Sequence, residues 1–254
     1  MNLGIIQGRL LGPVDGFIQE FPHNWRLEFE LLEKLDLSHV EWIVTQRSFN
    51  TNPIFFEDCR QYKISSLCAD NLVNSEIVSE AFLDDNLTPI CEAALKNEIE
   101  FVTIPLLEES DITSSEIRNK FTSHILKYAD KYPTLNFSFE AETSWENVMS
   151  IASKRNNFWI TYDTGNITSQ RINHEEYIRN TCSKINNVHI KDRTFDGQTV
   201  PPLSGDTDFE NIFNILKEVG YDGIYTLQTA RGVTGFEMRT IKQHKTIFDG
   251  MISL

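Results

Sequence analysis

The sequence predicts a single α/β domain over residues 1–254, a closed (β/α)8 barrel of parallel strands joined by helices. Short apolar runs alternate along the chain with longer amphipathic stretches, the pattern of parallel strands connected by crossover helices. The length of 254 residues also matches the roughly 250 residues typical of such a barrel. No linker or low-complexity tract separates the two halves. A doubly wound open sheet is the structural alternative, but neither GxGxxG nor GxxxxGK follows the first apolar run.

Eight apolar runs supply the predicted strands. In chain order they are residues 3–8, 40–45, 64–69, 101–106, 135–141, 158–162, 187–191 and 223–229. The clearest helix follows a capping-box pattern that begins at Thr207, and Gly220 is expected to end it. Asn24 is expected to cap an earlier helix with one apolar stripe. Between residues 70 and 85 the helical signal is weak.

The charge and composition of the chain restrict the classes of molecule that it can bind. A net charge of −14 without any basic run disfavours a nucleic-acid surface, because phosphate contacts need clustered Lys and Arg. The four cysteines show no CxxC spacing and are expected to be reduced. No apolar stretch approaches the ~20 residues of a membrane span, so we expect a cytoplasmic protein without a membrane partner. A homo-oligomer is compatible with the sequence.

Side chains with oxygen or nitrogen donors mark the ends of four predicted strands. In chain order they are Glu140, Asp163, His189 and Gln228. The carboxyl ends of parallel strands meet at one edge of a barrel, so these side chains would surround one mouth and suit a divalent metal. On local evidence alone, Glu140 with Glu142 also fits a solvent-facing strand end, and Asp163 a turn-forming residue.

His189 differs from an ordinary surface histidine by its context. It follows Val188 in a predicted central strand, where an unsatisfied imidazole would be costly to bury. Either a metal or a hydrogen bond must therefore satisfy it. The spacings between the four donors are each compatible with one strand, loop and helix of a barrel.

The order of several short motifs resembles the xylose isomerase-like barrel family of sugar phosphate isomerases and epimerases, from end to end of the chain. These motifs are residues 4–10, 19–22, Trp25, 28–29, 41–42, 162–166, 189–193 and 202–209. The resemblance implies that Glu140, Asp163, His189 and the residue at position 228 bind one divalent cation, Mn²⁺, Mg²⁺, Co²⁺ or Zn²⁺.

Position 228 departs from the family pattern. By the resemblance, the acid–base glutamates of the family correspond to Glu140 and to position 228, where this chain has Gln. An amide oxygen can bind a metal but cannot accept a catalytic proton, which puts a two-base epimerisation in doubt. Ser204 also interrupts the Gly-rich loop that the family usually carries here.

The sequence therefore predicts an enzyme, a metal-dependent isomerase or epimerase that removes a proton α to a metal-bound carbonyl of a sugar, polyol or sugar phosphate. Glu140 is the expected base, and Lys191 or Glu142 the source or relay of the second proton. The alternatives are a dehydratase or lyase of the same fold acting on a polyol or keto acid, and a catalytically degenerate sugar-binding barrel. An abasic-site endonuclease is disfavoured by the acidic charge.

Four further residues are expected to bind the substrate. Arg9 and Arg231, just beyond strand ends, could clamp a phosphate or carboxylate, with a salt bridge at the barrel rim as an equal alternative. Gln7 and Glu41 are assigned to substrate hydroxyls.

Overall fold

The computed structural model describes residues 2–253 and confirms the predicted closed barrel. Eight strands are hydrogen-bonded in the order β1, β10, β7, β6, β5, β4, β3, β2. They are β1 Leu3–Ile6, β2 Val40–Ile43, β3 Ile64–Cys68, β4 Phe101–Leu106, β5 Asn136–Ala141, β6 Phe158–Asp163, β7 Ile185–Ile190 and β10 Ile224–Leu227. All eight fall on the apolar runs that the sequence indicates, with ends that differ by a few residues.

Helices follow the strands, and a short ribbon follows β7. The α-helices are α1 Arg26–Lys34, α2 Pro53–Phe56, α3 Glu80–Asn86, α4 Thr88–Lys96, α5 Ser115–Lys131, α6 Trp145–Ala152, α7 Thr164–Ser169, α8 His174–Thr181, α9 Phe209–Glu218 and α10 Glu237–Ser253. The 3-10 helices are η1 Phe49–Thr51, η2 Asp70–Leu72, η3 Ser75–Val78, η4 Glu108–Ser110 and η5 Cys182–Lys184. The ribbon pairs β8 Asp192–Arg193 with β9 Thr199–Val200 in antiparallel fashion. The stretch with a weak helical signal holds η2, η3 and most of α3.

Two predicted helix starts are wrong by one residue. The N-cap of α1 is Trp25 rather than Asn24, and no side chain caps this helix. The N-cap of α9 is Asp208 rather than Thr207, and its carboxylate accepts a hydrogen bond from the amide of Asn211 at 3.1 Å. The predicted end of α9 is confirmed, because Gly220 follows it with a positive φ of 71°.

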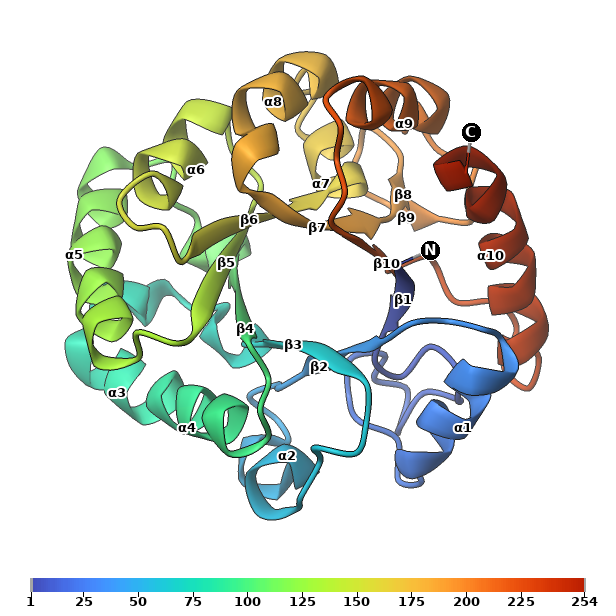
Figure 1. Cartoon of the computed structure of the whole chain (residues 1–254), viewed down its shortest axis with the longest axis horizontal. Helices are drawn as coiled ribbons and strands as arrows, with labels where there is room; N and C mark the ends of the chain where they lie inside the picture. Colours follow the sequence, from blue (N-terminus) through green and yellow to red (C-terminus); the bar gives the residue numbers. More distant parts are fainter. Residues whose placement is uncertain (1, 254) are drawn as a thin grey trace. The chain divides into compact units, whose positions relative to one another are not determined.

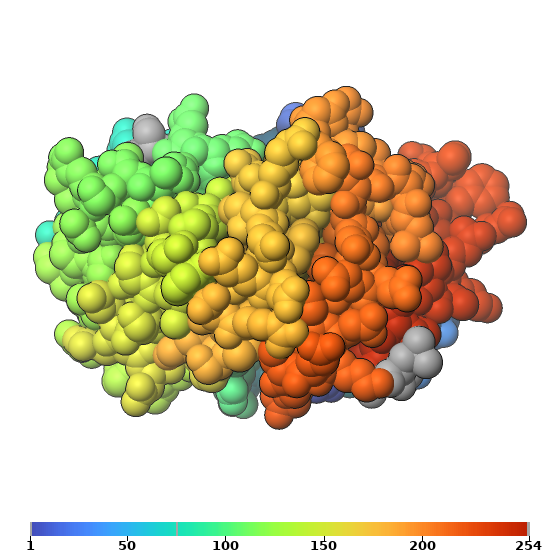
Figure 2. All heavy atoms as spheres, turned by 90° about the horizontal axis from the view of Figure 1, so that it is seen from above, coloured from blue at the N-terminus to red at the C-terminus, as the bar shows by residue number. Residues whose placement is uncertain are grey.

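The chain divides into two compact units. The first holds the chain up to Val40 and from Tyr162 onward. Its strands β1, β10 and β7 run side by side in parallel (Figure 1). Thr226 of β10 lies opposite His189 of β7. Helices α8 and α9 of this unit pack against each other at the surface, in yellow-orange and orange in the space-filling view (Figure 2).

The second unit, Glu41–Thr161, contains consecutive parallel strands. Thr103 of β4 lies opposite Ser138 of β5, and Glu140 lies opposite Thr161 of β6. The two faces of β5 differ as the alternation of its residues predicts. Phe139 packs edge-on against Phe121 of α5, whereas Ser138 on the other face hydrogen-bonds Thr161 at 2.7 Å.

Within residues 2–253, no helix combines the length and the apolar composition that crossing a membrane would need.

Candidate metal centre and adjoining cavity

The four predicted donors stand at the carboxyl ends of their strands and are buried. Glu140 is the next-to-last residue of β5, Asp163 the last of β6 and His189 the next-to-last of β7, while Gln228 follows β10 directly. Their exposed fractions are 3% for Glu140, 2% for Asp163, 0% for His189 and 8% for Gln228. Burial of four polar side chains at strand ends requires partners for each of them, as the sequence led us to expect for His189.

The strand registers bring these side chains together. Asp163 lies two residues beyond Thr161, which is opposite Glu140, and Gln228 lies two residues beyond Thr226, which is opposite His189. Residues two apart on a strand share a face, so each register places two donors on one face. Glu140, Asp163 and His189 each offer one ligand atom, and these atoms all lie within 4.8 Å of one another.

The residues present fit a divalent cation. Two carboxylates and one imidazole are ligands suited to Zn²⁺ or Mn²⁺. Among the described residues, the buried side-chain oxygen of Gln228 has no hydrogen-bond partner, and an amide oxygen left in this state suits a further metal ligand. The donor chemistry therefore agrees with a cation held by Glu140, Asp163 and His189, with Gln228 as a fourth candidate.

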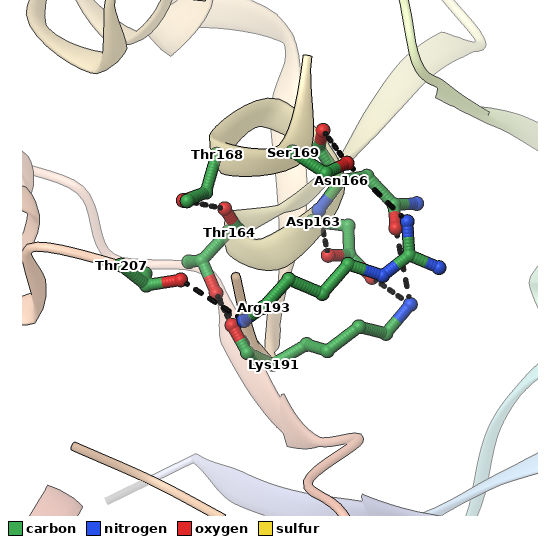
Figure 3. A network of polar contacts seen from close by, with 8 residues as sticks. All are labelled: Asp163, Thr164, Asn166, Thr168, Ser169, Lys191, Arg193 and Thr207. Carbon is green, nitrogen blue, oxygen red and sulfur yellow. Dashed lines mark hydrogen bonds and ion pairs between the residues drawn. The ribbon is translucent and has the colours of Figure 1, made fainter. Parts of the chain in front are cut away.

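Asp163 uses its two oxygens in different ways. Oδ1 accepts a hydrogen bond from the amide of Asn166 at 2.8 Å and thereby caps α7. Oδ2 lies 2.7 Å from the Nζ of Lys191, and this ammonium also donates to the Oδ1 of Asn166 at 3.2 Å (Figure 3). Burial opposes ionisation, but Lys191, His189 and the Asn166 amide outweigh it and hold the pKa of Asp163 below its usual value. Asp163 thus forms a turn and also belongs to the donor group, the three candidate metal ligands Glu140, Asp163 and His189.

Thr164 and Gly165 fix the position of Lys191. The hydroxyl of Thr164 donates to the carbonyl of Lys191 at 2.7 Å and accepts from the Lys191 amide at 3.0 Å. A methyl group at Gly165 would lie 2.9 Å from the Cγ of Lys191, so only glycine lets the lysine stem approach α7 this closely. Contacts to the backbone and to the aliphatic side chain of Lys191 therefore hold its ammonium beside Asp163.

Asp192 organises the loop after β7, a role that the sequence analysis did not assign. This fully buried carboxylate accepts hydrogen bonds from the amides of Ser204 and Gly205, both at 3.0 Å, and from the amide of Thr207 at 3.3 Å. A methyl group at Gly205 would come within 2.3 Å of the carboxylate and 2.7 Å of the Arg193 carbonyl. The signal in the sequence is a carboxylate directly after an apolar strand, followed at some distance by small residues.

The predicted arginine clamp is engaged with backbone. Arg231 donates to the carbonyls of Leu11 at 2.9 Å and Ile18 at 3.1 Å, and also to the carbonyl of Gly8. Arg9 donates to the same Ile18 carbonyl at 3.0 Å. Both arginines thus hold the loop between β1 and α1 in place.

Glu28 of α1 holds the start of the same loop. Its carboxylate accepts from the amides of Gly8 at 2.8 Å and Leu10 at 3.2 Å. Burial raises the pKa of Glu28 to about 7 despite these hydrogen bonds. Burial, together with the neighbouring Arg231, lowers the pKa of Arg9 to about 9.

A cavity of about 370 Å³ lies within the first unit and contains several of the predicted residues. It is lined by Arg9, Ile18, Gln19, Lys191, Arg193, Thr199, Gln228, Thr229, Ala230 and Arg231. Lys191 connects it to the donor group through its ion pair with Asp163. The structure thus brings Arg9, Arg231, Lys191 and Gln228 to one place.

The lining of this cavity does not include the remaining predicted residues, Gln7, Glu41 and Glu142. Gln7 is buried and donates to the carbonyl of Gln19 at 3.3 Å. Glu41 is fully buried in β2, and Glu142 is half-buried just past the end of β5.

Residues 124–246 match the family model described as xylose isomerase-like TIM barrel. The fold is a xylose isomerase-like TIM barrel. The resemblance indicated by the sequence motifs is thereby confirmed. None of the curated proteins compared with the chain matches it.

Solved structures of this barrel type cover the whole chain. The IolI protein with a binding zinc atom is 18% identical with a TM-score of 0.76, covering 100% of this chain and 98% of that one. A D-tagatose 3-epimerase-like protein is 18% identical with a TM-score of 0.72, covering 100% and 97%. The D-psicose 3-epimerase of Clostridium cellulolyticum H10, solved with D-tagatose, is 13% identical with a TM-score of 0.70, covering 99% of both chains.

Proposed function

We propose that the protein is an enzyme, a metal-dependent sugar isomerase or epimerase that removes a proton α to a substrate carbonyl. The observation that carries the proposal is the buried group of Glu140, Asp163 and His189, whose ligand atoms lie within 4.8 Å of one another. The xylose isomerase-like barrel and the sugar epimerases named among the similar structures support a small sugar or polyol as the substrate. When bound, the divalent cation would polarise the substrate carbonyl and stabilise the negative charge that develops as the proton leaves.

Glu140 is the proposed base. It is a buried carboxylate at the end of β5 and a member of the donor group, so a substrate held at the cation would have its carbonyl and α-carbon near this residue. Lys191 is the proposed proton donor, because its ammonium is buried beside Asp163 and lines the cavity. Glu142, two residues beyond Glu140, is the alternative relay.

Gln228 favours a second candidate reaction, a dehydratase or lyase of the same fold. The buried amide lines the cavity but offers no carboxylate that could accept a proton. A reaction that needs only one strong base does not require a carboxylate at position 228. An isomerisation in which Glu140 moves a proton on a single face of the substrate meets the same condition.

The test is solvent-hydrogen exchange with Glu140→Gln. The enzyme loaded with Mn²⁺ or Co²⁺ is incubated in heavy water with D-tagatose, D-psicose and related ketoses, and deuterium at the carbon next to the carbonyl is measured by NMR. We expect exchange by the wild-type protein and a loss of about a hundredfold or more in Glu140→Gln, since general-base catalysis contributes typically 10²–10⁴-fold. The loss should fall on kcat, because a base acts mainly in the transition state.

Glu146→Gln is the matched control, since Glu146 is an exposed carboxylate in the first turn of α6. It should exchange like the wild type. Equal exchange rates in Glu140→Gln and the wild type would remove Glu140 as the base, and Glu142→Gln and Lys191→Met would then be compared in the same assay.

A further inference from the structure

The cavity beside the donor group is lined by cations in a chain that is strongly acidic. The sequence contains 37 Asp and Glu against 23 Lys and Arg. Nevertheless, the side chains that line this cavity include Arg9, Lys191, Arg193 and Arg231, and none of the described residues lining it is acidic. A concentration of positive charge against the overall balance of the chain indicates a local function.

Backbone carbonyls accept hydrogen bonds from the Nη atoms of Arg9 and Arg231 without neutralising their charge, and within residues 2–253 the buried Nε atoms of both have no hydrogen-bond partner. Arg231 and Arg9 donate to carbonyl oxygens of the loop after β1. Burial and the positive charge of the neighbouring Arg231 lower the pKa of Arg9, because two like charges repel each other. Glu28 offsets part of this repulsion and contacts the loop amides. An anion in the cavity would relieve the repulsion further.

Arg193 lines the same cavity from a different element. It belongs to the short ribbon of β8 and β9, and its Nη1 lies 3.4 Å from the hydroxyl of Ser169, a long hydrogen bond (Figure 3). Thr199, on the other strand of the ribbon, lines the same cavity and adds a hydroxyl donor. A planar guanidinium in this position can bind a carboxylate or phosphate through two parallel hydrogen bonds.

We propose that this cavity is an oxyanion-binding subsite and that Arg193 is its main specificity-determining residue. The inference rests on the proposed function and narrows the substrate to a sugar or polyol that carries a phosphate ester or a carboxylate. Lys191 connects the subsite to the reaction centre, because its ammonium lies between the cavity and Asp163. A volume of about 370 Å³ suits a small ligand, since such sites span roughly 300–1,000 Å³.

Inorganic phosphate is the first probe of the subsite. Isothermal titration at low ionic strength should detect phosphate binding to the wild type. The affinity should fall by about tenfold or more in Arg193→Gln, because bidentate pairs with Arg are among the strong hydrogen bonds. Arg239→Gln removes an equal charge from an exposed position on α10 outside the cavity and should bind phosphate like the wild type.

The wild-type protein alone gives a second measurement, which holds even if Arg193→Gln does not fold. Phosphate affinity should weaken steeply as sodium chloride is raised, because the interaction is electrostatic. Absence of phosphate binding at low salt, or an equal loss of affinity in Arg193→Gln and Arg239→Gln, would overturn the proposal.

Exchange assays identify the source of the anion and separate this inference from the proposed function. A ketose, its terminal phosphate ester and the corresponding uronate are compared by kcat/KM for deuterium exchange. A preference of about tenfold or more for the ester or for the uronate, lost in Arg193→Gln, supports the subsite and names its ligand. Equal values for all three compounds would overturn the subsite and leave the isomerase proposal intact. Phosphate binding that depends on Arg193, without exchange in any compound, would leave the subsite and reject the isomerase.

Discussion

The Nζ of Lys191 lies 2.7 Å from Oδ2 of Asp163, the carboxylate that also belongs to the candidate metal group. A buried lysine thus neutralises a buried aspartate at the place where a cation would do the same. The exposed side-chain fractions are 9% for Lys191 and 1% for Asp163, so solvent screens this pair little.

Lys191→Met should make stability depend on metal. Removing one partner of a buried ion pair leaves the other charge uncompensated, which costs about 3–5 kcal/mol of unfolding free energy. Mn²⁺ should restore part of this loss, so its addition should raise the melting temperature more in Lys191→Met than in the wild type. Differential scanning calorimetry with and without the ion measures both quantities. Lys154→Met, at an exposed position after α6, should show the wild-type response. A metal response of equal size in all three proteins would contradict a common site for the lysine and the cation.

His189→Ala should lower metal affinity sharply. The imidazole is fully buried and offers one of three clustered ligand atoms, so its loss removes a nitrogen ligand that water can replace only weakly. Elemental analysis of protein purified without chelator should find about one divalent ion per wild-type chain and far less in the variant. His23→Ala changes an exposed histidine and should retain the metal. Full occupancy in His189→Ala would exclude His189 from the ligand set.

Gln228 allows the proton chemistry to be altered by a single atom. Gln228→Ala should weaken metal binding, because the unpartnered buried side-chain oxygen is lost. Gln228→Glu should keep a ligand oxygen and add a carboxylate that can accept a proton, so some epimerase activity should appear. Chiral chromatography of the products detects inversion at the carbon next to the carbonyl. If Gln228→Ala bound metal as tightly as the wild type, the residue would act on the substrate alone.

Three hydrogen bonds determine the tautomer of His174. The hydroxyl of Thr168 donates to the Thr164 carbonyl at 2.8 Å, so the Nε2 of His174 must donate to that hydroxyl, at 3.0 Å. The Nδ1 must then accept from the hydroxyl of Tyr162 at 2.5 Å. Burial raises the pKa of Tyr162 well above its usual value, which keeps this donor protonated. A neutral His174 therefore braces α7, the helix that Asp163 caps.

This network predicts a loss of stability in acid. Burial lowers the pKa of His174 from 6.5 to about 4. Below pH 6.5 this histidine binds a proton in the unfolded chain but stays neutral in the folded protein. The free energy of unfolding therefore falls as the pH drops from 6.5 toward 4. The loss should reach roughly 2–3 kcal/mol, since one pKa unit corresponds to about 1.4 kcal/mol.

Urea denaturation at stepped pH measures this loss. His174→Gln should be less stable at pH 7 but should lose less free energy of unfolding between pH 7 and pH 4. His23→Gln, at an exposed position, should retain the wild-type slope. Identical slopes in His174→Gln and the wild type would contradict the assigned protonation state.

The alternation of apolar runs was sufficient to predict the barrel and its eight strands, because burial on both faces leaves a strong signal in the sequence. Donor residues at strand ends could likewise be predicted, since strand direction places Glu140, Asp163 and His189 at one edge. The roles of side chains that contact the backbone could not be predicted from the sequence. Arg231 donates to loop carbonyls, and Asp192 accepts from loop amides. The loop conformations that allow these contacts leave no periodic pattern in the sequence. Helix caps were misplaced by one residue for the same reason, since side-chain geometry decides between Thr207 and Asp208.

Among the residues that the structure describes, the lining of the cavity comes from three stretches, residues 9–19, 191–199 and 228–231. Each stretch follows a strand, and Glu140 and Asp163 belong to none of them. Two of the candidate metal ligands thus lie outside the stretches that line the cavity, whereas Lys191 and Gln228 belong to the lining as well. Exchange of the loop after β1, which contributes Arg9, Ile18 and Gln19, between barrels of this type would alter the cavity lining while Glu140, Asp163 and His189 stay untouched, which makes the scaffold a suitable recipient for grafted specificities.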